Sequence, residues 1–223
     1  MSQQVLPFYL VCDESSSMQG MPIDAINKSL PELHQEIGGN PVVADKTRFA
    51  LISFNHAAQV LLPLSDLSNV TSVPALTAAG GTNYSAAFDL VRDLITQDVA
   101  QLKKDGHQVL RPTIFFLTDG QPNDTSEWPA AHQRLTDAGW APHPNILAFG
   151  FGQADATTIQ QVATIRGFIA DGTLSPAQAL QEFAQSLTRS IVRSGSSLDA
   201  TGGMSLAMPD KVPGFTTVPA DVI

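Results

Sequence analysis

Short apolar runs alternate along the chain with longer segments in which apolar positions recur every three or four residues. The first pattern is typical of strands buried in a sheet, and the second is typical of helices packed against one. Six predicted strands span residues 6–12, 48–54, 59–64, 113–117, 145–151 and 167–170. Five predicted helices span residues 22–37, 84–104, 126–137, 156–163 and 176–192, and Pro31 predicts a kink or a break in the first of them.

The connections between these elements predict the topology of the sheet. Residues 55–58 alone join the second and third strands, which is typical of a hairpin of antiparallel neighbours. The other strands are separated by helices, which favours parallel pairing with helices on both faces. The sequence therefore predicts a doubly wound, Rossmann-like α/β fold, with a mostly parallel six-stranded sheet and one antiparallel edge strand.

The composition changes near the C-terminus. From residue 194 onward Gly, Ser, Thr and Pro dominate, and no helical periodicity remains. We therefore predict one α/β domain over residues 1–193 and a C-terminal tail over residues 194–223. Within that tail, Leu206, Phe215 and Val218 are candidates for docking against the domain.

Composition and charge exclude several classes of function. Hydrophobic residues make up 43% of the 223 residues and charged residues 15%, as in a folded domain, and the net charge of -9 argues against a nucleic-acid-binding face. Cys12 is the single cysteine, which excludes an intramolecular disulfide and a cysteine-based zinc site and suits a reducing compartment. The first apolar run is interrupted by Pro7 and is too short for a signal peptide or a membrane span. We therefore expect a cytoplasmic location.

Oxygen-bearing side chains follow two of the predicted strands and precede one helix. Asp13, Ser15 and Ser17 come after the first strand, Thr82 lies in a glycine-rich turn, and Asp119 follows the strand at 113–117. If the hairpin lies on one side of the first strand and the later strands on the other, Asp13 and Asp119 flank the switch point where such sheets bind ligands. Two carboxylates and three hydroxyls are hard ligands, suited to Mg²⁺ or Mn²⁺, and Ca²⁺ also takes oxygen ligands. Because the hydroxyls are neutral, the cation retains charge with which to attract one more carboxylate from outside.

Simpler interpretations exist for each of these residues. Aspartates and serines after a strand commonly cap helices or bond loop amides, so each residue alone is weak evidence. Their combination, in this order and at the ends of these strands, favours the metal site. The five histidines show no ligand spacing and are predicted to lie on the surface. Glu14 is predicted to be a solvated loop acid, with gating of the metal as the alternative.

At these residues the sequence resembles the von Willebrand factor A family. The metal-ion-dependent adhesion site (MIDAS) of that family reads Asp-x-Ser-x-Ser, then Thr, then Asp, which Asp13, Ser15, Ser17, Thr82 and Asp119 match. The resemblance covers roughly residues 5 to 193. It implies direct coordination by the two serines, a threonine that binds directly or through water, and aspartates that act largely through water or hydrogen bonds.

Further local likeness is to the TerY-like bacterial proteins of tellurite-resistance and stress-response systems. The residues that carry it are Ser17-Met18-Gln19-Gly20, Gly80-Gly81-Thr82, the run from Leu117 to Asp124, and Trp128. One departure is Glu14-Ser15-Ser16, where many relatives have Thr-Ser-Gly. The likeness implies an intracellular bacterial protein whose partner is a kinase, a phosphatase or another protein encoded in the same operon.

The function that follows is a divalent-metal-dependent protein–protein interaction module rather than an enzyme. The protein partner supplies an Asp or Glu to the metal, with no role for nucleic acid or a membrane span. The alternative is a Mg²⁺-dependent phosphoryl-transfer enzyme or phosphatase. Against it, Ser15 stands where haloacid-dehalogenase-like phosphatases have a second Asp, no lysine lies in an obvious phosphate loop, and Gly-x-Ser-x-Gly is absent.

Overall fold

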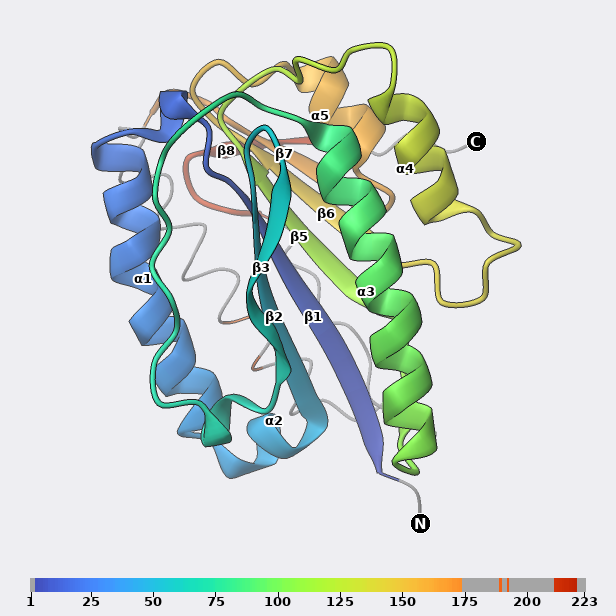
Figure 1. The fold of residues 1–223 in the computed structure, drawn as a ribbon. Coiled ribbons are helices and arrows are strands. Elements are labelled where there is room, and N and C mark those ends of the chain that lie inside the picture. The colour runs from blue at the N-terminus through green and yellow to red at the C-terminus, as the bar shows by residue number, and fades with distance from the viewer. Residues whose placement is uncertain (1–2, 174–188, 190–191, 193–210, 220–223) are drawn as a thin grey trace.

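A single twisted sheet organises the molecule (Figure 1). The computed structural model describes residues 3–173, 189, 192 and 211–219. Within these residues the sheet has eight strands: seven run in the order β3-β2-β1-β5-β6-β7-β8, and the short β4 pairs with the start of β1. The strands are β1 (Gln4–Asp13), β2 (Thr47–Phe54), β3 (Ala58–Ser65), β4 (Gln108–Val109), β5 (Thr113–Thr118), β6 (Asn145–Gly150), β7 (Arg166–Ala170) and β8 (Phe215–Pro219).

Helices cover both faces of this sheet. The described helices are α1 (Met21–Gly38), α2 (Pro41–Lys46), α3 (Tyr84–Lys104), α4 (Trp128–Thr136) and α5 (Ala156–Val162), with 3-10 turns η1 (Ser16–Met18) and η2 (Leu67–Asn69). Buried side chains of α1 belong to one core cluster, and those of α3, α4 and α5 belong to the other. The doubly wound architecture predicted from the alternation of strands and helices is therefore confirmed.

The central strand β1 shows why the sequence adopts this arrangement. It pairs in parallel with β2 on one side and β5 on the other, so nearly its whole length is buried. Successive side chains of a strand point to opposite faces. Phe8 and Leu10 therefore enter the α1 core, whereas Tyr9 and Val11 enter the α3 core. A continuous apolar run is what a strand with two buried faces requires.

The structure differs from the sequence prediction at the edges of the sheet. The hairpin of β2 and β3 is antiparallel as predicted, but β8 adds a second antiparallel edge beside β7. This strand comes from the segment predicted as a tail, and Phe215 docks against the α1 core as expected. The predicted helix 176–192 lies almost wholly outside the described residues, as do Leu206 and the boundary at residue 193, which stay predictions.

The sequence predicted a kink or a break at Pro31; helix α1 runs through this residue without ending, so the break does not occur. Proline removes one intrahelical hydrogen bond, a loss that packing can offset. Ile26 and Leu30 lie before the proline and Leu33 and Ile37 after it, and all four are buried in the same core. The packing of this apolar face holds both halves of the helix on the sheet.

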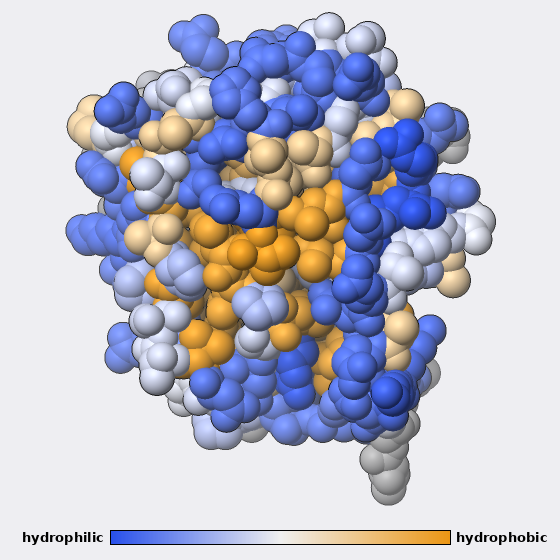
Figure 2. Space-filling view, viewed as in Figure 1, coloured by the Kyte–Doolittle hydropathy of each residue, from blue (hydrophilic) through white to orange (hydrophobic). Residues whose placement is uncertain are grey.

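Apolar side chains gather on the surface over β3, between α1 and α3 (Figure 2). Leu61 and Leu64 of this edge strand are partly buried and pack against the two core clusters. The end of the molecule at the top of Figures 1 and 2 is polar by contrast. That end carries the loops that follow the parallel strands.

Candidate metal site

The sheet brings the ends of β1 and β5 together. The two strands are hydrogen-bonded neighbours, and their register pairs Cys12 with Leu117. The hairpin strands β2 and β3 lie on one side of β1, and β5, β6 and β7 lie on the other. Asp13 and Asp119 therefore flank the switch point of the sheet, which confirms the arrangement on which the sequence argument rested.

Four of the five predicted ligands form one hydrogen-bonded chain. The backbone N–H of Ser15 donates to Oδ1 of Asp13 at 2.7 Å, and the hydroxyl oxygens of Ser15 and Ser17 lie 2.9 Å apart. The hydroxyl of Ser17 donates to Oδ1 of Asp119 at 2.7 Å. The first loop is thereby joined to the end of β5, across 102 residues of sequence.

The fifth predicted ligand, Thr82, faces the same point. A Cβ placed on Gly120 would lie 3.5 Å from Oγ1 of Thr82, and 3.9 Å from both Oδ2 of Asp13 and Oγ of Ser17. Oxygens from two separate segments thus converge on the space beside Gly120, where the absence of a side chain leaves room. Asp119, the residue before Gly120, joins them through its hydrogen bond with Ser17. All five predicted residues are brought together.

Burial divides the site into a floor and an opening. Asp13 is 0% exposed, Ser15 3%, Asp119 5% and Thr82 6%. Ser17 is exposed. A ligand in this site would be held from below by carboxylate and hydroxyl oxygens and approached from solvent on the Ser17 side.

Burial disfavours the charged form of the two carboxylates in the site. Burial raises the pKa of Asp13 to about 6; hydrogen bonds from Thr118 and Ser15 oppose this rise, and the nearby charge of Asp119 adds to it. Burial likewise raises the pKa of Asp119, against the hydrogen bond from Ser17. Within the described part of the chain, neither carboxylate forms an ion pair with a basic side chain. A bound cation would stabilise the charged form of both carboxylates and offset their mutual repulsion.

A buried hydroxyl relay orients Asp13. Thr118 donates its hydroxyl to Oδ2 of Asp13 at 2.6 Å. Tyr84, which is fully buried at the start of α3, contacts Oγ1 of Thr118 at 3.2 Å and the carbonyl of Gly120 at 3.1 Å. Sequence analysis missed this role of Tyr84, because it depends on a contact between residues 34 positions apart.

The loop after β5 is hydrogen-bonded to the turn that carries Thr82. The backbone N–H of Thr82 donates to Oδ1 of Asn123 at 2.7 Å, and the N–H of Asn123 donates to the carbonyl of Thr82 at 2.8 Å. The next residue, Asp124, accepts hydrogen bonds from the N–H groups of Tyr84 and Ser85 and from the Ser85 hydroxyl. Asn123 and Asp124 belong to the run that carried the family resemblance, but their positions in sequence did not reveal these contacts.

Glu14 is not the solvated loop acid that the sequence suggested. It is 3% exposed, and its Oε1 accepts a hydrogen bond from the N–H of Thr77 at 2.7 Å. The reason is that residues 77–80 fold over the end of β1 and cover it, which the sequence pattern does not show.

The donor set fits a hard divalent cation. Hydroxyl and carboxylate oxygens are the ligands of Mg²⁺, Mn²⁺ and Ca²⁺. Among the described residues, no group of three or more His, Cys, Asp or Glu side chains is placed to hold a metal. The hydroxyls of Ser15, Ser17 and Thr82 would therefore complete a shell that the two aspartates alone could not.

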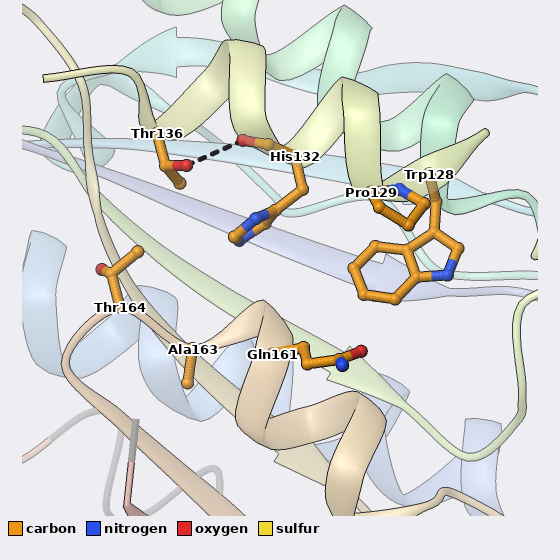
Figure 3. A pocket seen from close by; sticks show the side chains of 7 residues that line it. All are labelled: Trp128, Pro129, His132, Thr136, Gln161, Ala163 and Thr164. Carbon is orange, nitrogen blue, oxygen red and sulfur yellow. Dashed lines mark hydrogen bonds between the residues drawn. The ribbon is translucent and has the colours of Figure 1, made fainter. Parts of the chain in front are cut away.

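A separate cavity of about 380 Å³ lies between α4 and α5 (Figure 3). Its lining includes the rings of Trp128 and His132 on one side and Ala163 on the facing side, but none of the five site residues. None of the five histidines is buried: His56 is exposed, and His132 and the other three are partly exposed. Nε2 of His132 contacts the carbonyl of Val162 at 2.9 Å. Burial lowers the pKa of this histidine.

Several solved structures share the fold. The pilus adhesin SpaC from Lactobacillus rhamnosus GG is similar with a TM-score of 0.65 and 14% identity, over 86% of this chain and 31% of that one. The mussel byssus proximal thread matrix protein 1, in a structure with a zinc-occupied MIDAS motif, gives 0.58 and 16%, over 86% and 48%. The ArnB paralog VWA2 from Sulfolobus acidocaldarius gives 0.55 and 17%, over 85% and 46%. The chain thus spans less than half the length of each.

Sequence comparison identifies the family directly. No curated protein matches the chain significantly. In the residues that the structure describes, no helix has the length and apolar character needed to cross a membrane. The family model described as von Willebrand factor type A domain matches residues 8–187, which include all three segments of the site. The chain therefore belongs to the von Willebrand factor type A domain family.

Proposed function

We propose that this domain binds one divalent cation through Asp13, Ser15, Ser17, Thr82 and Asp119 and uses it to hold an acidic side chain of a partner protein. The observation that carries the proposal is the convergence of oxygens of Asp13, Ser17 and Thr82 beside Gly120. The carboxylates of Asp13 and Asp119 are buried there, and neither has a basic partner among the described residues. The metal-ion-dependent adhesion motif of the family has the same residue types in the same order.

The residues take distinct roles in this proposal. The hydroxyl oxygens of Ser15 and Ser17 bind the cation directly, and Thr82 binds it directly or through water. Asp13 and Asp119 orient these ligands by hydrogen bonds and balance the charge from beneath. When bound, the cation supplies local positive charge that a carboxylate can reach from solvent. The exposure of Ser17 supports this direction of approach.

We propose Mg²⁺ or Mn²⁺ as the cation, with Ca²⁺ as a third oxygen-binding candidate, because hydroxyl-rich shells suit hard ions. The mussel protein described with zinc in its motif makes zinc the competitor to test. Calorimetric titration with each ion should give one site with modest affinity and a preference for Mg²⁺ or Mn²⁺. Binding should be lost in Asp13→Ala and Ser15→Ala and retained in Asp93→Ala, an exposed acid on α3. Unchanged binding in the two site variants would remove the assignment.

The cellular setting that we propose is that of an intracellular TerY-like stress-response protein. The Gly80-Gly81-Thr82 turn, the run from Leu117 to Asp124 and the buried Cys12 as single cysteine support it. A tagged chain expressed in bacteria should recover a partner from the cytoplasmic fraction with Mg²⁺ or Mn²⁺ and release it in chelator. Recovery only from surface or secreted fractions would contradict this setting while leaving the metal site standing.

We propose further that the domain is not an enzyme. Ser15 occupies the place where an aspartate-based phosphatase needs a second carboxylate, and its hydroxyl is bonded to that of Ser17. Incubation of the Mg²⁺-loaded protein with p-nitrophenyl phosphate should release no phosphate above the Asp13→Ala background. Turnover that depends on both Mg²⁺ and Asp13 would favour the phosphoryl-transfer alternative.

A further inference from the structure

The segment of residues 66–83, called here the crossing segment, links β3 to α3 and delivers Thr82 to the site. In Figure 1 it runs along α1 and then over the top of the sheet. It is held to α1 by Asn27, whose side chain donates to the carbonyl of Leu76 at 3.0 Å and accepts from the N–H of Leu76 at 2.7 Å. The very next residue, Thr77, is held by Glu14.

From Thr77 onward the crossing segment is hydrogen-bonded to the loop of residues 13–17, which carries Asp13, Ser15 and Ser17. The N–H of Thr77 donates to Oε1 of Glu14 and the N–H of Ala79 donates to the carbonyl of Glu14, both at 2.7 Å. The N–H of Ser16 donates to the carbonyl of Gly80 at 3.0 Å. Glu14 thus uses both its side chain and its backbone to hold the part of the crossing segment that ends in Thr82.

The far end of the same stretch is fixed as well. Asn123 binds both the N–H and the carbonyl of Thr82. Gly80 lies between these two hydrogen-bonded residues, Thr77 and Thr82. Its φ of +81° puts it in the left-handed region that glycine favours. The stretch that carries the Thr82 hydroxyl is therefore held at both ends, at Thr77 and at Thr82, as well as through the backbone of Ala79 and Gly80.

We propose that Glu14 is a positioning residue for the cation: its carboxylate holds the crossing segment so that the Thr82 hydroxyl meets the ion beside Ser15 and Ser17. A buried carboxylate is costly unless it accepts hydrogen bonds, and an ionised acceptor makes a stronger bond to an amide than a neutral one. Glu14 also follows Asp13 at the end of a strand, where successive side chains point in opposite directions. It acts on the ion through Thr82 rather than as a ligand.

The proposal rests on the proposed metal binding and is tested by a double-mutant cycle on Mn²⁺ affinity. Glu14→Ala should weaken Mn²⁺ binding about ten-fold, as is typical of residues that orient metal ligands. Glu14→Gln keeps an oxygen acceptor for Thr77 and should stay within about two-fold of the unmodified chain. In a Thr82→Ala background, Glu14→Ala should add less than about two-fold, because the ligand it positions is gone.

Asn27→Ala is the matched control, because it removes the other anchor of the same segment one residue away. It should leave Mn²⁺ affinity within about two-fold. Amide hydrogen exchange of the metal-free protein gives a second readout: Glu14→Ala should speed exchange at Thr77, whose acceptor it removes, and Glu14→Gln should not.

A ten-fold loss in Asn27→Ala as well, or equal losses from Glu14→Ala with and without Thr82, would overturn the positioning role and assign Glu14 to general loop stability. No loss in Glu14→Ala would overturn it too. If the unmodified chain binds no Mn²⁺, the proposed function itself fails, and the inference fails with it.

Discussion

The candidate metal site and the cavity between α4 and α5 both gather polar side chains that are largely buried, yet they differ in kind. In the cavity, the polar groups are neutral and bonded locally: His132 contacts the carbonyl of Val162, and the Thr136 hydroxyl donates to the carbonyl of His132 (Figure 3). At the ends of β1 and β5, two carboxylates are buried, and the part of the chain that the structure describes offers neither of them a basic partner. Unbalanced charge, rather than volume, marks the place where a ligand is needed.

The largest effect that would sharpen this contrast is expected from Gly120→Ala. In the metal-free protein the added Cβ has ordinary contacts of 3.5 to 3.9 Å with three site oxygens, so the fold should be retained. The same methyl group would occupy space that the ion and its waters need, and affinity should fall about 100-fold. Calorimetry with Mn²⁺ measures the loss, and thermal unfolding checks the fold. Gln161→Ala, an exposed residue in the lining of the cavity, is the control and should change neither.

Asp13→Asn tests the charge directly. Because burial raises the pKa of Asp13 from 3.8 to about 6, the stability linked to its protonated form is complete below pH 3.8 and is lost as pH rises through about 6. Asparagine does not titrate. The metal-free variant should therefore be more stable than the unmodified chain by about 1–3 kcal/mol at about pH 8, and the difference should vanish near about pH 4.

Urea unfolding at a series of pH values measures this difference in free energy. Saturating Mn²⁺ should reverse the order at about pH 8, since the ion stabilises only the chain that binds it. A variant no more stable than the unmodified chain in chelator would show that the site is not strained without a cation.

Asn123→Ala should have an intermediate effect. It removes the acceptor for the N–H of Thr82 and leaves the backbone bond from residue 123 in place. We expect Mn²⁺ affinity to fall about ten-fold, or roughly 1.4 kcal/mol, through misplacement of the Thr82 hydroxyl. Asn69→Ala, an exposed asparagine at the end of η2, should leave the affinity as it is. Equal affinity in both variants would show that Thr82 needs no support from the loop after β5.

The smallest effect is expected in the cavity, from His132→Gln. Glutamine keeps a donor for the carbonyl of Val162, so stability near neutral pH should change by less than about 1 kcal/mol and Mn²⁺ affinity should not change. Burial lowers the pKa of His132 below its usual value of 6.5. The stability that the neutral imidazole contributes is therefore present above pH 6.5 and is lost on acidification. Unfolding curves should show that the unmodified chain loses stability below 6.5 and the variant does not. The pH dependence thus has the opposite sign to that of Asp13.

Local sequence patterns predicted the parts of this molecule that depend on neighbours in sequence. The apolar run before Asp13 and the helical spacing after Thr82 correspond to β1 and α3, with α3 matching its predicted bounds of residues 84–104. Asp13 and Asp119 were expected to meet because the ends of parallel strands lie at one edge of the sheet. Thr82 follows no strand, and the order of residue types in the family motif indicated its place in the site.

The contacts that support the site could not be predicted in the same way. Glu14 and Thr77 are 63 residues apart, and Thr82 and Asn123 are 41 apart. No periodicity in the sequence indicates that these pairs meet. The strand β8 was missed for a related reason, since its five residues follow glycine and proline and acquire strand structure only by pairing with β7.

The dispersal of the site over residues 13–17, 82 and 119 has a consequence for recognition. These segments meet only when β1 and β5 are paired and the Thr82 turn is in place, so an unfolded or half-assembled chain offers no complete cation shell. Under the proposed function, a partner that contacts the ion therefore also verifies that the chain is correctly assembled. Damaged or immature copies would be ignored without any separate proofreading step.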